Sequence, residues 1–109
     1  MDKAPVRQAQ LLRMADALRA AAHQADWERL GEHARALAPQ LRALAARGPW
    51  NPAERAALQR LRGAHDDAAR AAAAAADALA VRLEALRNNK DGWLAYAMHG
   101  DTVSGASHA

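Results

Sequence analysis

WERLGEHARALAPQLRAL, residues 27–44, is the stretch of sequence that decides the fold. Its apolar positions alternate by three and four residues without a break, and they are Trp27, Leu30, Ala34, Leu37, Leu41 and Leu44. This spacing places them along one side of an α-helix, as in the seam between packed helices. We therefore expect a helix over this stretch whose seam, Trp27 included, is buried against neighbouring helices.

Signals for helix ends flank this stretch on both sides. Asp26 offers a carboxylate at the position of an N-cap. Gly48 and the proline after it are typical of residues just past a helix end. A new helix is predicted next, with Asn51 as its N-cap, Pro52 at its first position and Glu54 completing a capping box.

Two further helices are expected, one before and one after this stretch. The first runs from about residue 4 or 5 to about residue 25, and its seam consists of Leu11, Ala15, Leu18, Ala22 and Ala25. The other begins after Asn51, and its seam consists of Leu58, Leu61, His65, Ala68, Ala72, Ala75, Leu79, Arg82 and Leu86. If it reaches residue 88 it has about 37 residues and a length of about 55 Å. On this seam His65 is expected to be partly buried and hydrogen-bonded.

A break is expected after this long helix, at Asn88, Asn89 and Gly92. A short amphipathic helix then spans residue 91 to about residue 99 and carries Trp93, Leu94, Tyr96 and Met98. Such a short helix is marginal by itself. We expect its apolar side chains to dock on the alanine-lined groove of the long helix as a removable cover, or else to complete the core.

The composition favours an all-α fold. The 109 residues include 33 alanines and 13 leucines but no phenylalanine or isoleucine, and only three valines and one threonine. Alanine and leucine are strong helix formers, whereas β-branched residues favour sheets. The expected fold is an antiparallel helical bundle of three main helices, the third one long, plus a short C-terminal helix. We expect a single domain over residues 1–99 and a disordered tail over residues 100–109.

The same composition disfavours several classes of function. The absence of cysteine excludes disulfides and thiolate–metal sites and fits a reducing cytoplasm. The formal net charge is +3, but the basic residues are interleaved with 12 carboxylates, whereas a nucleic-acid binder clusters its basic residues. Nucleic acid is therefore not an expected partner. No apolar run approaches the roughly 20 residues of a membrane span, and the first ten residues lack the apolar core of a signal peptide.

No catalytic, metal-binding or cofactor site is expected. The carboxylate–histidine neighbours Glu32-His33 and His65-Asp66 are adjacent in sequence, and adjacent residues on a helix point about 100° apart. Serine and threonine occur only in the C-terminal tail, and there is no glycine-rich phosphate loop. We expect a non-enzymatic protein, without cofactor, that works by binding other proteins.

The charge at a seam position of the long helix has two interpretations. Burying Arg82 costs desolvation free energy unless the side chain is paired or reaches solvent along its stem. It could snorkel to solvent or pair with Glu84 or Asp77. Alternatively, it could face a partner in a groove that the other helices leave open.

Three short motifs occur in order along the chain: ADWERL at residues 25–30, RLEAL at residues 82–86, and Lys90 followed by Ala95-Tyr96. They resemble the Gly-(Asp/Glu)-Trp-x-x-Leu, Arg-Leu-x-x-Leu and lysine with Ala-Tyr motifs of FliT-type flagellar export chaperones. The helix pattern is similar over roughly residues 5–99. In this sequence Ala25 stands where the family has glycine, and the interval between the last two motifs is about two turns shorter.

The resemblance implies a cytoplasmic chaperone of flagellar type III export. Such a chaperone binds the filament-cap protein, prevents its premature assembly and delivers it to the export apparatus. We expect the partner-binding residues on the late long helix and the last helix, namely Leu79, Arg82, Leu83, Leu86, Lys90, Trp93 and Tyr96. Two alternatives stay open from the residues alone: a generic coiled-coil adaptor that forms a homodimer, and a helical nucleic-acid-binding protein.

Overall fold

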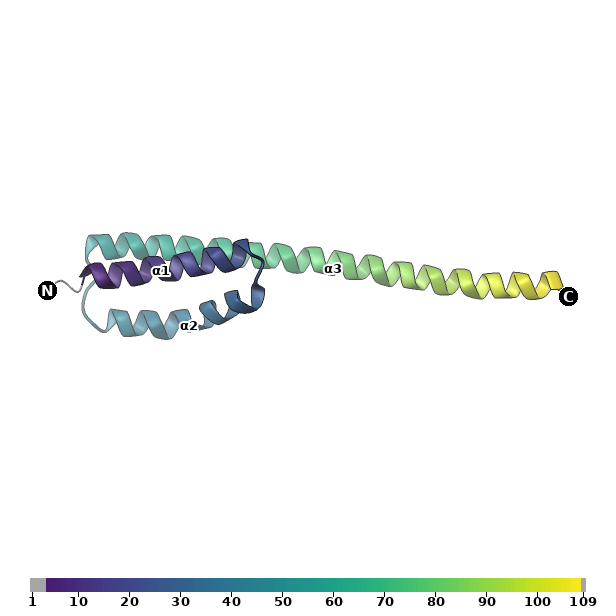
Figure 1. Cartoon of the computed structure of the whole chain (residues 1–109), viewed down its shortest axis with the longest axis horizontal. Helices are drawn as coiled ribbons and strands as arrows, with labels where there is room; N and C mark the ends of the chain where they lie inside the picture. Colours follow the sequence, from purple (N-terminus) through teal and green to yellow (C-terminus); the bar gives the residue numbers. More distant parts are fainter. Residues whose placement is uncertain (1–3, 109) are drawn as a thin grey trace. The chain divides into compact units, whose positions relative to one another are not determined.

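The chain forms three α-helices in the computed structural model, which describes the backbone of residues 4–108 and the side chains of residues 6–99 (Figure 1). Helix α1 spans Ala4–His23, α2 spans Trp27–Ala45 and α3 spans Pro52–His108. No strand occurs within residues 4–108. The all-α fold and the long third helix predicted from the sequence are confirmed.

The chain divides into two compact units, Met1–Ala74 and Ala75–Ala109. In the first unit, α1, α2 and the part of α3 up to residue 74 lie side by side, with α2 running opposite to the other two (Figure 1). An ion pair between Arg19 and Asp67, with 3.8 Å between Nη1 and Oδ2, joins α1 to α3. The first unit is therefore an antiparallel three-helix bundle.

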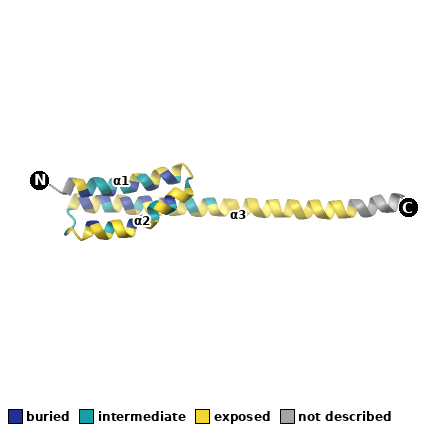
Figure 2. Ribbon diagram, turned by 60° about the horizontal axis from the view of Figure 1, so that its bottom comes forward, coloured by how far each residue is buried: buried dark blue, intermediate teal, exposed yellow. Residues whose placement is uncertain are grey.

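A core of leucines and alanines fills this bundle (Figure 2). Its members are at most 9% exposed and comprise Leu11, Ala15, Leu18 and Ala21 from α1, Leu30, Leu37 and Leu44 from α2, and Ala57, Leu61, Ala64 and Ala68 from α3. The small alanine side chains allow neighbouring helices to approach closely, so a few leucines suffice to fill the interior. The seam predicted for residues 27–44 is confirmed at its three buried leucines.

Three seam predictions are wrong. Ala25 is exposed and lies beyond the end of α1. Trp27 is 37% exposed, because it is the first residue of α2 and lies at the end of the bundle. The side chain of His65 is 49% exposed, and its Nδ1 lies 3.9 Å from an Asp66 carboxylate oxygen. Helix α3 buries Ala57 and Ala64 in the bundle, so the side that it turns to the core is centred one residue earlier than predicted.

The turn between α1 and α2 follows a standard helix-ending pattern. The Asp26 N–H donates to the Ala21 carbonyl at 2.9 Å, and the Ala25 N–H donates to the Ala22 carbonyl at 3.1 Å. This pair of bonds is the Schellman motif, which places Ala25 in the left-handed region, with φ of 56°. Asp26 then caps α2 by accepting from the Arg29 N–H at 3.1 Å, which confirms the predicted N-cap.

The start of α3 is the capping box predicted from the sequence. The Glu54 N–H donates to the Asn51 side-chain oxygen at 2.7 Å, and the Asn51 N–H donates to Glu54 Oε1 at 2.8 Å. Two backbone donors that the helix start leaves free are thereby satisfied. Pro52 is the first residue of α3, also as predicted.

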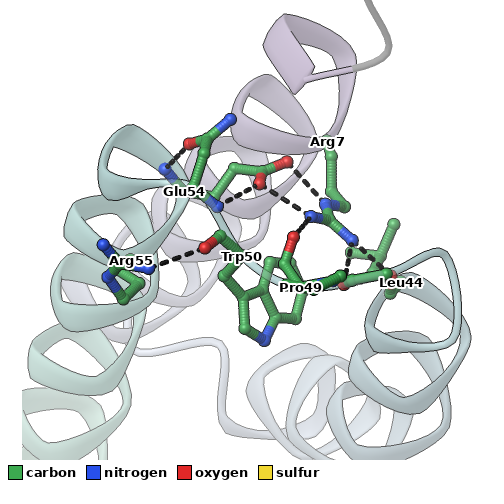
Figure 3. A network of polar contacts seen from close by, with 8 residues as sticks. Arg7, Leu44, Pro49, Trp50, Glu54 and Arg55 are labelled. Atoms are coloured by element: carbon green, nitrogen blue, oxygen red, sulfur yellow. Dashed lines mark hydrogen bonds and ion pairs between the residues drawn. The ribbon is translucent and has the colours of Figure 1, made fainter.

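At this end of the bundle, the buried Arg7 contacts α2, α3 and the loop between them (Figure 3). The Arg7 guanidinium donates to both carboxylate oxygens of Glu54, with 2.7 Å between Nη2 and Oε1. It also donates to the carbonyls of Leu44, Gly48 and Pro49 at 2.8–3.1 Å. Its Cζ lies 4.2 Å from the centre of the Trp50 ring. The Arg7 side chain of α1 thus donates hydrogen bonds to the end of α2, to the loop that follows it and to Glu54 at the start of α3.

Arg7 is not among the residues predicted from the sequence, although its position carries a signal. Arg7 stands four residues before Leu11 and therefore continues the seam of α1 toward its start. The hydrogen bonds from Arg7 lower the pKa of the Glu54 carboxyl from 4.5 to about 2, with a further contribution from the Asn51 N–H and against the opposing effect of burial. The carboxylate is therefore charged at neutral pH, and the buried pair is fully hydrogen-bonded.

The predicted break near residue 90 is wrong. Helix α3 continues through Asn88, Asn89 and Gly92, so no separate short C-terminal helix exists. Asparagine and glycine lower helix propensity by at most about 1 kcal/mol each, and the strong helix formers around them outweigh that cost. The bounds of α3 include residues 100–108, and Ala109 lies outside the described residues. The predicted division of the chain at residue 99 stays a prediction.

Candidate partner-binding surface

The second unit carries large apolar side chains that are open to solvent. Figure 2 colours almost all of its described residues as exposed. Exposed fractions run from 52% to 74% for the members of what we call the apolar stripe, which are Leu79, Leu83, Leu86, Trp93, Leu94 and Tyr96. An apolar patch of this length on one helix marks an interaction site in many proteins. It spans 18 residues, or about 27 Å at 1.5 Å per residue.

Helix geometry gathers these side chains on one side of α3. At about 100° per residue, every member of the apolar stripe lies within about 80° of Leu86 around the helix axis. Leu79 and Trp93 are seven residues before and after Leu86 and therefore lie almost in line with it. Tyr96 and Leu94 form the two edges of the apolar stripe. The last turns of the described side chains thus gather six large apolar residues on one face.

The polar residues on this face are cationic or neutral. Arg82, Asn89 and Lys90 lie within about 60° of Leu86, and all three are exposed. The three carboxylates of this segment are Asp77, Glu84 and Asp91, which recur every seven residues. The same geometry places them about 140–180° from Leu86, on the opposite side of the helix. The apolar stripe therefore has basic residues within it and acidic residues behind it.

The structure excludes one interpretation of Arg82, which is an ion pair with Glu84 or Asp77. Glu84 forms an ion pair with Arg87, with 3.6 Å between the carboxylate oxygen and Nη1, and not with Arg82. Among the described side chains of residues 6–99, Arg82 and Lys90 take part in no ion pair. The predicted pairing of Arg82 with Glu84 or Asp77 is wrong. Its side chain is exposed, as expected if it reaches solvent along its stem, and a contact with a partner stays a prediction.

Most of the site residues predicted from the sequence come together on this face. Six of the seven, namely Leu79, Arg82, Leu83, Leu86, Lys90 and Trp93, lie within about 60° of Leu86, and Tyr96 is at the edge. Leu94 is not among the predicted site residues, although its neighbours Trp93 and Tyr96 are. A continuous helix brings Leu94 onto the same face. That these residues bind a partner stays a prediction.

The predicted cover is wrong. Trp93, Leu94 and Tyr96 were expected to dock on the long helix or to complete the core, but they belong to that helix and are 74%, 54% and 74% exposed. Residues within a continuous helix cannot dock as a separate helix on a groove of that helix. Deleting them should therefore remove part of the apolar stripe and not free it.

A second apolar surface lies within the bundle, between α2 and α3. A groove there is lined mainly by Leu37, Leu41, Leu58 and Leu61. Leu41 and Leu58 are half-buried, so part of each leucine side chain is open to solvent. Arg62 and His65 also line it and are exposed. The groove is formed by the helices that build the core, whereas the apolar stripe contributes nothing to that core.

The described residues contain no group of three or more His, Cys, Asp or Glu side chains that could hold a metal ion. Over the same part of the chain, no helix is both long and apolar enough to cross a membrane. Comparison with models of protein families, with curated proteins and with solved structures finds no match for this chain. The resemblance to FliT-type chaperones therefore rests on the three motifs quoted from the sequence.

Proposed function

We propose that this protein is a cytoplasmic export chaperone of the flagellar type III system. Its apolar stripe holds an amphipathic helix of the filament-cap protein, keeps that subunit from assembling prematurely and presents it to the export apparatus. Capture of one amphipathic helix by the apolar face of another follows the same rules as helix packing in a bundle.

One observation carries the binding role. Side chains such as Leu86 and Trp93, 57% and 74% exposed, contribute nothing to the bundle core. Covering this face with a partner would remove apolar surface from water, which is the main favourable contribution to association. Binding of a partner along this face would bury it.

A local feature at the first turn supports the family resemblance. Ala25 adopts φ of 56° at the position where the FliT-type motif has glycine. Glycine is the residue that adopts this conformation without strain. The motif therefore coincides with the backbone geometry that its usual glycine serves.

The proposal is tested by titrating the filament-cap protein of the same bacterium into the purified chain, with heat measured by calorimetry. We expect a saturable complex that Leu83→Glu abolishes, because a buried, unpaired carboxylate would replace an apolar contact. Val81→Glu is the matched control. Val81 is 70% exposed on the same helix but lies about 140° from Leu86.

Both variants should keep the helix content of the parent by circular dichroism. Equal loss of binding in Leu83→Glu and Val81→Glu would count against the apolar stripe as the binding face. Absence of any complex with the cap protein, with the chain folded, would overturn the proposed client.

A dimeric coiled-coil adaptor is the second candidate, and a specific observation favours it. Leu79, Leu86 and Trp93 recur every seven residues, which is the period of a coiled-coil seam. Sedimentation equilibrium of the purified chain separates the two candidates. A dimer that Leu86→Glu dissociates would support the adaptor, whereas a monomer that binds the cap protein supports the chaperone.

A further inference from the structure

The geometry points to a particular chemistry for the partner of the apolar stripe: an amphipathic helix with carboxylates flanking its apolar face. This inference deepens the proposed function and rests on it, because it assumes that a helix is captured there. It goes further by naming what distinguishes the right helix from other amphipathic helices.

The distribution of charge around α3 carries the argument. Arg82 and Lys90 lie eight residues apart on the same face as Leu86, and neither forms an ion pair among the described side chains. A helix lying along this face would bring its own flanking side chains next to both cations. Carboxylates there would pair with these two cations beside the apolar contact, whereas lysines would meet like charge.

The acidic residues strengthen this selectivity by their placement. Asp77, Glu84 and Asp91 lie on the far side of the helix, where a bound helix does not reach them. A basic partner therefore finds no carboxylate on the binding face. The segment from residue 75 to residue 98 is neutral overall, with three acidic and three basic residues, yet its two sides have opposite charge.

This charge pattern disfavours a second copy as the occupant. Two apolar stripes facing each other in parallel would place Arg82 opposite Arg82 and Lys90 opposite Lys90. In an antiparallel pair the interface would still hold four cations and no carboxylate. Like charges brought together in this way oppose pairing.

The neutral net charge also disfavours an anionic membrane surface. Helices that lie on such membranes combine an apolar face with an excess of lysine and arginine, and each added cation strengthens binding. In this segment the three acidic residues cancel the three basic ones. A protein helix that places carboxylates next to Arg82 and Lys90 fits the observed pattern better.

The test uses the full chain and three synthetic 18-residue amphipathic peptides, of the same length as the apolar stripe. The peptides share one leucine face and differ only in the flanking residues, which are all Glu, all Gln or all Lys. Binding is followed by fluorescence anisotropy of a dye on each peptide. We expect the Glu peptide to bind about fivefold more tightly than the Gln peptide, and the Lys peptide to bind most weakly.

Charge reversal supplies the matched pair of variants. Arg82→Glu should weaken binding of the Glu peptide and strengthen binding of the Lys peptide. Arg87→Glu makes the same change about 100° from Leu86 and should leave the order of the three affinities unchanged. The preference should also shrink between about 0.05 M and about 0.5 M salt, because exposed charges are screened.

Each other outcome overturns the inference. Equal binding of the three peptides, lost in Leu83→Glu, would leave helix capture in place and remove the charge selectivity. Dimerisation of the chain tighter than its binding to the Glu peptide would make a second copy the occupant. Tighter binding to anionic phospholipid vesicles than to the Glu peptide would make an anionic membrane the occupant of the apolar stripe. If no peptide binds, the inference fails, while the titration with the cap protein still tests the proposed function separately.

Discussion

Truncation to alanine of two leucines at seam positions should change the free energy of unfolding by very different amounts. Leu44 is 1% exposed and belongs to the bundle core, whereas Leu86 is 57% exposed. Leu44→Ala removes fully buried methyl groups and leaves a cavity, so it should lower the free energy of unfolding by about 2–5 kcal/mol. Leu86→Ala should change it by no more than about 0.5 kcal/mol, because little of this side chain is buried and alanine is the better helix former.

The comparison requires urea unfolding of both variants, followed by far-UV circular dichroism. Domains of this size have free energies of unfolding of about 5–15 kcal/mol, so the loss predicted for Leu44→Ala is a large fraction of the total. Its transition midpoint should fall well below that of the parent, while Leu86→Ala overlays it. A loss of several kcal/mol in Leu86→Ala would refute the reasoning, because it would mean that the apolar stripe is part of the folding core.

Three further predictions concern the ends of the helices. Asn51→Ala removes the N-cap of α3 and should cost about 1 kcal/mol in urea unfolding; unchanged stability would mean that the capping box contributes nothing. Ala25→Gly relieves the left-handed strain at φ of 56° and should stabilise the bundle by about 1 kcal/mol; destabilisation would contradict the Schellman turn. Because the pKa of Glu54 is about 2 when folded and 4.5 ordinarily, its contribution to stability is complete above pH 4.5 and is lost as pH falls toward 2. Melting temperatures between about pH 5 and pH 2 should therefore drop more steeply for the parent than for Glu54→Gln. Parallel profiles would mean that titration of Glu54 does not cause the loss of stability.

The sequence predicted the bundle well because its signals are local. A helix N-cap such as Asp26 and the capping box at Asn51 and Glu54 depend on residues within one turn of each other, so the printed sequence contains the whole motif. The same holds for the seam leucines Leu30, Leu37 and Leu44, whose spacing specifies the buried side of α2. Predictions of this kind need no knowledge of the rest of the fold.

The wrong or missing predictions concern contacts between residues distant in sequence, or a balance of small contributions to helix stability. The contact of Arg7 with Glu54 joins residues 47 positions apart, and no local pattern indicates which carboxylate an arginine in α1 meets. The break at Asn88, Asn89 and Gly92 is predicted because all three are weak helix formers. The alanines and leucines around them favour the helix more strongly, and the helix continues. The predicted cover depended on the same break.

The apolar stripe could be predicted as a set of residues but not as an exposed surface. Leu79, Leu83 and Leu86 were identified because they are the large apolar residues after an alanine-rich run. Whether they are buried or open depends on which other segments reach them, and that information is absent from a helical pattern. The free state of Arg82 and Lys90 likewise follows from the position of the carboxylates around the finished helix.

Hydrogen–deuterium exchange of the full chain, alone and saturated with the filament-cap protein, tests the central claim most directly. The account predicts that binding slows exchange over residues 79–96, where backbone hydrogen bonds of an exposed helix open readily in the free protein. Exchange in the α2–α3 groove, around Leu41 and Leu58, should stay unchanged. Protection confined to that groove, with residues 79–96 exchanging as fast as in the free chain, would contradict it.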